Sequence, residues 1–319
     1  MQCKNISQMS KVKDLRDFDS LFELMDYFKT EEICEEYLAT IRWNGKPTCP
    51  YCESEKVKVL NGTTKRLKCY GCKKQFGVKV GTIFHDTKIS LRKWFIAVYI
   101  ITAHKKGISS HQLSRDLKVT QKTAWFMLHR VREAYNQNAE MFSDEVEIDE
   151  TYIGGKESNK HAHKKTPGTQ GRSTKTKTAI LGILNRNGNV YASPVLDTKR
   201  TTILPILLDK IERGSTVYTD EYRPYRSLAK DFIHDFVKHN TAEYVKGLAH
   251  TNNIEGFWAI LKRGIIGIYH QISSKHLFRY VNEFSFRYNN RKISDASKFD
   301  VALTNAVNKR LDYKTLVHG

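Results

Sequence analysis

The stretch HTNNIEGFWAILKRG, residues 250 to 264, separates its side chains into two faces if it folds as a helix. At about 100° per residue, the apolar face holds Ile254, Phe257, Trp258 and Leu261, and the polar face holds Asn252, Glu255, Ala259 and Lys262. The first face is suited to packing. The second offers an amide, a carboxylate and an ammonium group. On its own, the stretch is equally compatible with an ordinary amphipathic surface helix.

Glu255 needs acidic partners if this helix is to hold a divalent metal ion, because one carboxylate rarely binds Mg²⁺ without help. Two aspartates qualify, Asp149 in VEIDETYIGG and Asp220 in the β-branched run STVYTDEYRPY. Two aspartates on strands and a glutamate on a helix can converge to hold two Mg²⁺ or Mn²⁺ ions about 4 Å apart. Such a pair of ions supports phosphodiester chemistry.

The residues around these acids predict an α/β domain over residues 144 to 292. In its first strand, Val146 and Ile148 face one way while Glu147 and Asp149 face the other. A hairpin, a helix and two more strands follow before the helix that carries Glu255. A polar loop, residues 156 to 177, contains seven Lys or Arg residues and is either a phosphate-binding segment or a solvated insertion.

Four of the six cysteines form two C-x₂-C pairs, CPYC and CYGC, with sixteen residues between them. These are Cys49, Cys52, Cys69 and Cys72. The spacing predicts a zinc ribbon over residues 45 to 80, with a hairpin turn at Asn61 and Gly62. Four thiolates leave no open ligand position, so the Zn²⁺ would be structural. Disulfides are the alternative, which the absence of a secretion signal disfavours.

Two further regions read as helical. Residues 14 to 44 predict two short amphipathic helices, and the hydroxyl of Thr30 is placed to cap the second.

Residues 88 to 138 predict a helix-turn-helix, in which a short helix at about 109 to 117 precedes a longer one starting at Thr120. The longer helix opens with QKT, polar side chains that could reach base edges or phosphates. A plain helical bundle between two domains is the alternative. Residues 293 to 319 are expected to form a C-terminal tail.

The charge points to a polyanionic partner. The 319 residues carry a net charge of +19, and residues 37 to 319 alone hold 48 bases and 25 acids. Such an excess is best explained by nucleic acid, although a merely basic soluble protein is the simpler alternative. No stretch of about 18 apolar residues and no apolar signal-peptide core is present. We therefore expect a cytoplasmic, nucleoid-associated protein.

Taken in order, CPYC, CYGC, DETYIGGK, YTDEYRPY and HTNNIEGFWAILKRGIIGIYHQIS resemble the zinc-ribbon DDE transposases of bacterial insertion sequences, in the family numbered fifteen-ninety-five. The resemblance runs from about residue 20 to residue 292. It implies a ribonuclease-H-like catalytic domain in which Asp149, Asp220 and Glu255 match the acidic triad. Lys262 matches the basic residue seven positions after the third acid.

In parts of this family an asparagine is the third member, so Asn252 or Asn253 is the alternative to Glu255. The resemblance also implies that the protein binds double-stranded DNA at transposon ends and target, acts as a homo-oligomer on DNA, and catalyses metal-dependent cleavage and strand transfer. Two other functions remain open from the residues. One is a zinc-ribbon and helix-turn-helix transcription regulator, and the other is a nuclease of the same fold without strand transfer.

Overall fold

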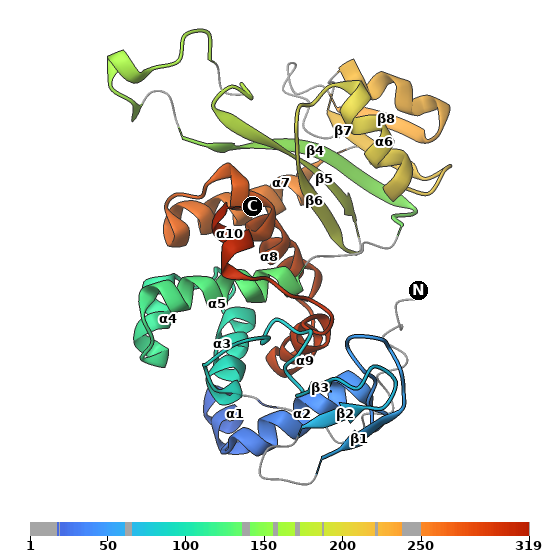
Figure 1. The fold of residues 1–319 in the computed structure, drawn as a ribbon. Helices are drawn as coiled ribbons and strands as arrows, with labels where there is room; N and C mark the ends of the chain where they lie inside the picture. Colours follow the sequence, from blue (N-terminus) through green and yellow to red (C-terminus); the bar gives the residue numbers. More distant parts are fainter. Residues whose placement is uncertain are drawn as a thin grey trace. The chain divides into compact units, whose positions relative to one another are not determined.

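The computed structural model describes residues 18, 20–60, 66–135, 141–155, 159–169, 173–186, 188–220, 223–237 and 250–318. The chain (Figure 1) divides into two compact units. The first comprises Met1–Ala103 and Ile293–Asn308, and the second comprises His104–Lys292 and Lys309–Gly319. The division falls inside the predicted region 88 to 138.

The helical part of the first unit contains α1 (Leu21–Tyr27), α2 (Glu31–Trp43), α3 (Leu91–Ala103) and α9 (Asp295–Asn305). The hydroxyl of Thr30 accepts a hydrogen bond from the Ile33 amide and caps α2, as predicted. Residues 293 to 319, expected as a tail, carry α9 in this unit and α10 (Tyr313–His318) in the second. Helix α9 packs on α2 and α3, where Tyr37 donates to Asp300 at 2.5 Å.

The ribbon of the first unit is a three-stranded antiparallel sheet, β1 (Val57–Val59), β2 (Leu67–Cys69) and β3 (Gln75–Phe76), in that spatial order. One side of the sheet is buried around Cys49, Leu67, Cys69 and Phe76. The predicted turn at Asn61 and Gly62 lies outside the described residues, but the strands on either side of it pair as a hairpin requires.

The second unit is built on a five-stranded mixed sheet, which confirms the predicted α/β class. Its strands are β4 (Glu145–Gly154), β5 (Lys177–Asn185), β6 (Val190–Val195), β7 (Thr216–Asp220) and β8 (Ile233–Val237). Their spatial order is β6-β5-β4-β7-β8 (Figure 1). β4, β7 and β8 run parallel, whereas β5 is antiparallel to both β4 and β6.

Each face of this sheet buries its own apolar cluster. Val146 and Ile148 pack on one face with α6 (Arg200–Lys210) and the 3-10 segment Arg223–Lys230. On the other face lie α7 (Asn252–Gly264) and α8 (Leu277–Asn289). The predicted apolar face of α7 is almost fully buried there, which confirms the orientation of that helix.

Two helices stand where the helix-turn-helix was predicted, α4 (Ser110–Leu117) and α5 (Gln121–Ala134). Lys118 takes the left-handed conformation that ends α4, and the Thr120 hydroxyl caps α5. Helix α5 is tied to α8 by a buried ion pair between Arg132 and Glu283, with 2.6 Å between Nε and Oε2. The DNA-binding role of α4 and α5 stays a prediction.

The described residues of the second unit also form further short helical segments. They are Ala162–Lys164, Ile265–Tyr269 and Ser274–His276. In the part of the chain that the structure describes, no helix combines the length and the apolar character needed to cross a membrane.

Candidate functional site

Strands β4 and β7 bring Asp149 and Asp220 to the same end of the sheet. The two strands are parallel, and their pairing ends at Glu147 and Tyr218. Each aspartate lies two residues beyond the last residue that β4 and β7 pair with each other. Because successive residues alternate sides, each aspartate points to the same face as the residue two before it. The aspartates are therefore neighbours on adjacent interior strands, just beyond the point where the β4–β7 pairing ends, on the face covered by α7.

A carboxylate on β4 fixes the start of α7. Thr251, the residue before the helix, makes no capping hydrogen bond with its side chain. Instead, Oε2 of Glu147 accepts from the backbone amides of Asn253 at 3.0 Å and Ile254 at 3.1 Å. A negative charge at this end also interacts favourably with the helix dipole. The strand that carries Asp149 thus holds the first turn of the helix that carries Glu255.

The Glu147 side chain is fully buried and its second oxygen is also satisfied. Oε1 accepts from Nε of Arg186 at 3.0 Å and from Nδ2 of Asn253 at 2.9 Å. Arg186, at the end of β5, also donates to the carbonyl of His250 at 3.0 Å and lies 3.8 Å over the Tyr218 ring. A buried carboxylate is stable only with such partners, and here they join β4, β5, β7 and α7.

Asp149 lies in an environment that favours its neutral form. Burial, followed by the nearby charges of Asp220 and Glu255, raises the pKa of Asp149 to about 7, against opposing hydrogen bonds from the Glu150 amide and Trp258. The Trp258 bond runs from Nε1 to Oδ2 at 3.0 Å. Of the other two carboxylates, Asp220 is half-buried and Glu255 is exposed. The three predicted acids thus lie close enough together for Asp220 and Glu255 to raise the pKa of Asp149.

A glycine makes room for the tryptophan that contacts Asp149. Gly182 of β5 pairs with Asp149 across the sheet. A Cβ atom built on Gly182 would lie only 2.5 Å from the Trp258 ring and 2.8 Å from Cδ1 of Ile254. The indole therefore occupies the space above Gly182, and this position lets its N–H reach the aspartate.

The remaining predicted side chains of α7 differ in their surroundings. Asn252 and Lys262 are exposed, whereas the Asn253 amide is committed to Glu147. Glu255 accepts from the Thr251 hydroxyl at 3.1 Å. Lys262 stands on the same exposed face as Glu255, two turns further along the helix.

The Sγ atoms of the four predicted cysteines lie together in an arrangement that can hold a metal ion. The Sγ atoms of Cys49 and Cys72 are 3.6 Å apart, as are those of Cys52 and Cys69. These separations exclude disulfide bonds, and they match the edge of about 3.8 Å that a tetrahedron with Zn–S distances of about 2.3 Å requires. Among the described residues, this is the one cluster of three or more potential ligands with metal-binding spacing.

The surroundings of the Cys69 thiol favour loss of its proton. The Cys72 amide donates to Sγ of Cys69 at 3.4 Å. This hydrogen bond is the largest contribution lowering the pKa of Cys69, to about 6. A thiolate is the form that binds zinc. The donor set therefore fits a structural Zn²⁺.

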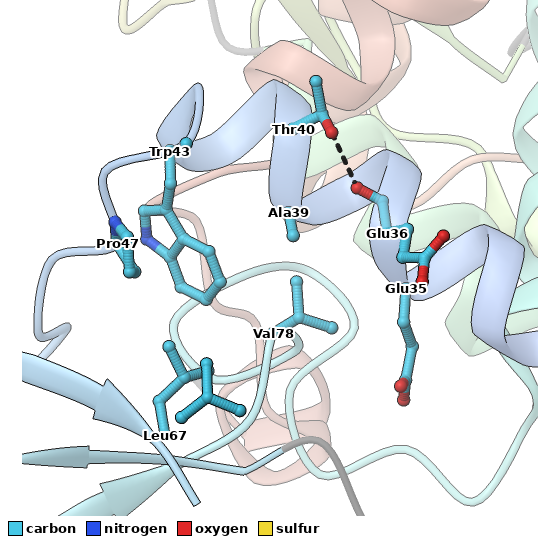
Figure 2. A pocket seen from close by; sticks show the side chains of 10 residues that line it. Glu35, Glu36, Ala39, Thr40, Trp43, Pro47, Leu67 and Val78 are labelled. Atoms are coloured by element: carbon cyan, nitrogen blue, oxygen red, sulfur yellow. Dashed lines mark hydrogen bonds between the residues drawn. The ribbon is translucent and has the colours of Figure 1, made fainter.

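A separate hollow of about 490 Å³ lies in the first unit, between α2 and the ribbon. Figure 2 shows Trp43, Pro47, Leu67 and Val78 gathered around it, with Glu35 on α2. The hollow is mainly apolar and contains none of the three carboxylates. It is therefore no part of the candidate site.

Comparison with known proteins finds two transposase domain families in the chain. Residues 141–289 match the family described as the ISXO2-like transposase domain, and residues 29–75 match the transposase zinc-ribbon domain. An uncharacterized protein in transposable element ISH50 of Halobacterium salinarum is 30% identical over 272 residues, covering 82% of this chain and 91% of that protein. The chain belongs to the IS1595 family of transposases.

A second relative of this transposase chain covers less of it. An uncharacterized transposase-like protein of Haemophilus influenzae is 32% identical over 105 residues, which is 33% of this chain and 84% of that protein.

Two residues that contact Asp149 or hold the start of α7 are not predicted from the sequence. The sequence pattern indicates only the side of the strand to which Glu147 points, and only a packing role for Trp258. The alternation along β4 did place Glu147 on the face of Asp149, and this was the available signal. The sequence does not indicate that the N-terminus of a helix contacts Glu147, because α7 begins 105 residues later.

Adding a methyl group at Gly182 tests the packing that supports Asp149. We expect Gly182→Ala to lower the free energy of unfolding by about 1–3 kcal/mol, because the indole must move. Gly256→Ala is the matched control, since it lies on exposed α7 surface with no atom within 4 Å of the added carbon. That change should be neutral or stabilise by up to about 1 kcal/mol. Urea unfolding measures both, and equal effects would contradict the packing argument.

The pKa of Asp149 predicts an unusual pH dependence of stability. The pKa rises from 3.8 to about 7 on folding, so the stabilising contribution of the protonated group is complete below pH 3.8 and is lost as pH rises through 7. In zinc-loaded protein without added Mg²⁺ or Mn²⁺, the wild type should therefore lose stability relative to Asp149→Asn between pH 5 and pH 8. The loss should be a few kcal/mol, at about 1.4 kcal/mol per pKa unit. Parallel curves from urea unfolding would contradict the prediction.

Proposed function

We propose that the chain binds the ends of its insertion sequence and catalyses metal-dependent DNA cleavage and strand transfer. The observation that carries this proposal is the grouping of Asp149, Asp220 and Glu255 near the point where the β4–β7 pairing ends, where burial and then the charges of Asp220 and Glu255 raise the pKa of Asp149. The strand order, with its antiparallel β5 between β6 and β4, supports a ribonuclease-H-like assignment.

The acids would hold Mg²⁺ or Mn²⁺. When bound, the ions supply activation of the attacking oxygen and stabilisation of the leaving one. In this proposal Asp149 and Asp220 would be ligands of these ions, and Glu255 would hold the second ion. Burial and the neighbouring acids together raise the pKa of Asp149. A bound cation would offset the repulsion among the three acids, so the charge distribution suits a divalent ion.

The side chains of α7 favour glutamate over asparagine as the third member. Asn253 donates to the buried Glu147 carboxylate, so its amide supports the helix start. Glu255 interacts electrostatically with Asp149 and is exposed to solvent, where a ligand can reach it. Asn252 is exposed but lacks any such link to Asp149. Lys262 can only donate, so we assign it to a DNA phosphate rather than to a metal.

DNA binding would come from the helix pair α4 and α5 together with the ribbon. The first residues of α5, Gln121 and Lys122, are exposed, as a helix entering the major groove requires. The net charge of +19 supplies the attraction to phosphates. Joining the two ends of an element also requires more than one catalytic centre, which supports assembly of several copies on DNA.

Substitution of the acids tests the catalytic assignment. Asp149→Asn and Asp220→Asn should each lower cleavage and strand transfer by at least about 100-fold, more than the loss for groups that only support metal ligands. Binding to element ends should change little, because those contacts lie on other surfaces. Oligonucleotide cleavage and joining assays with Mg²⁺ or Mn²⁺, alongside an end-binding titration, provide both readouts.

The third member is tested by a matched pair on α7. Glu255→Gln should abolish joining while Asn252→Ala should retain it. The reverse result would assign the third position to asparagine. Cleavage by the wild type without any joined product would replace the transposase proposal with a nuclease.

A further inference from the structure

The register of the ribbon sheet places two lysines directly opposite each other. Lys58 on β1 pairs with Lys68 on β2, on the side of the sheet opposite the buried Leu67 and Cys69. Like charges in direct cross-strand opposition destabilise an antiparallel pair. The ribbon thus has two lysines that repel each other on its solvent-facing side. This repulsion does not help the ribbon to fold.

A third lysine joins this pair around one aromatic ring. The ammonium groups of Lys58, Lys68 and Lys73 lie 5.8, 5.9 and 5.8 Å from the centroid of the Tyr70 ring. The ring is 45% exposed. No acidic side chain among the described residues forms an ion pair with any of the three lysines, so their charges are not balanced within the described part of the ribbon.

The ring is held by the fold of the metal centre. Tyr70 follows Cys69, and its amide donates to the carbonyl of Lys56 at 2.8 Å. At the end of the same C-x₂-C turn, Lys73 follows Cys72 and has a left-handed backbone with φ 64°. Tyr70 and Lys73 are therefore each adjacent to a predicted zinc ligand, and the backbone that carries the ring is part of the ribbon's own hydrogen-bonded fold. We call Lys58, Lys68, Tyr70 and Lys73 the Tyr70 face.

We propose that the Tyr70 face binds an unpaired stretch of DNA, with one base stacked on Tyr70 and the adjoining phosphates on the lysines. This inference rests on the proposed function, because single-strand or staggered cleavage at an element end would expose unpaired nucleotides. Three like charges gathered around an exposed ring suit a ligand that is both anionic and flat. Single-stranded nucleic acid has both properties.

Duplex DNA fits the same face less well. In a duplex each base is stacked between its neighbours, so the face of an aromatic side chain finds only sugar and phosphate. In a single strand the base face is available, and every base offers one. Lysines without a central exposed ring would suit either form. The ring at their centre favours the unpaired strand.

The test compares two DNA ligands on the full-length, zinc-loaded protein. One is a blunt duplex carrying the element end, and the other is the same duplex with a short single-stranded extension. By fluorescence anisotropy, we expect the extension to tighten binding about 5- to 100-fold. Tyr70→Ala should remove this gain and leave blunt-duplex affinity unchanged. Tyr70→Phe should retain it, because the ring remains.

Tyr51→Ala is the matched control. Tyr51 is 47% exposed on the same ribbon but has a single lysine, Lys74, over its ring at 4.7 Å. It should keep the gain from the extension. Lys68→Gln should lower the slope of log affinity against log salt for the extended ligand by about 0.7, the value for one single-strand phosphate contact.

The outcomes separate this proposal from the proposed function. If the blunt duplex end is bound but the extension adds nothing, or if Tyr70→Ala keeps the gain, the Tyr70 face is a solvated surface and the inference is overturned. If the protein prefers neither the element end nor its extended form over random DNA, the proposed end binding itself fails. Equal losses in Tyr51→Ala and Tyr70→Ala would also contradict a site centred on Tyr70.

Discussion

The second unit depends on one buried carboxylate, Glu147. A fully buried charge is strongly unfavourable unless donors surround it. Here two backbone amides of α7, the Asn253 side chain and Arg186 supply them. Removing any one of these partners would leave part of the charge unsatisfied. The helix start, the end of β5 and the middle of β4 are therefore held together by a single group.

This constraint sets the geometry of the candidate active site. Asp149 lies two residues after Glu147 on the same strand. Glu255 directly follows Ile254, whose backbone amide donates a hydrogen bond to Glu147. Both acids are thus within two residues of the same contact. The indole of Trp258 then reaches Asp149 one turn further along α7. A shift of α7 along the sheet would break the cap, the indole bond and the grouping of acids at once.

Much of this could be predicted from the sequence because it follows from periodicity and spacing. The two faces of α7, the alternation around Asp149 and the paired cysteines are local patterns. The role of Glu147 could not be predicted, since it depends on where a helix 105 residues away comes to rest. The helices in residues 293 to 319 were missed because α9 is stabilised by packing on α2 and α3. The opposition of Lys58 and Lys68 needed the strand register.

Hydrogen exchange at the first turn of α7 tests most directly whether Glu147 holds that helix. Glu147→Gln keeps the shape but turns one acceptor into an N–H₂ group facing donors, so the amides of Asn253 and Ile254 should exchange faster. Glu145→Gln is the control, because Glu145 lies 3.5 Å from Arg186 but makes no described contact with α7. The account predicts loss of protection in residues 252 to 256 for Glu147→Gln alone. Unchanged protection in that variant would contradict it.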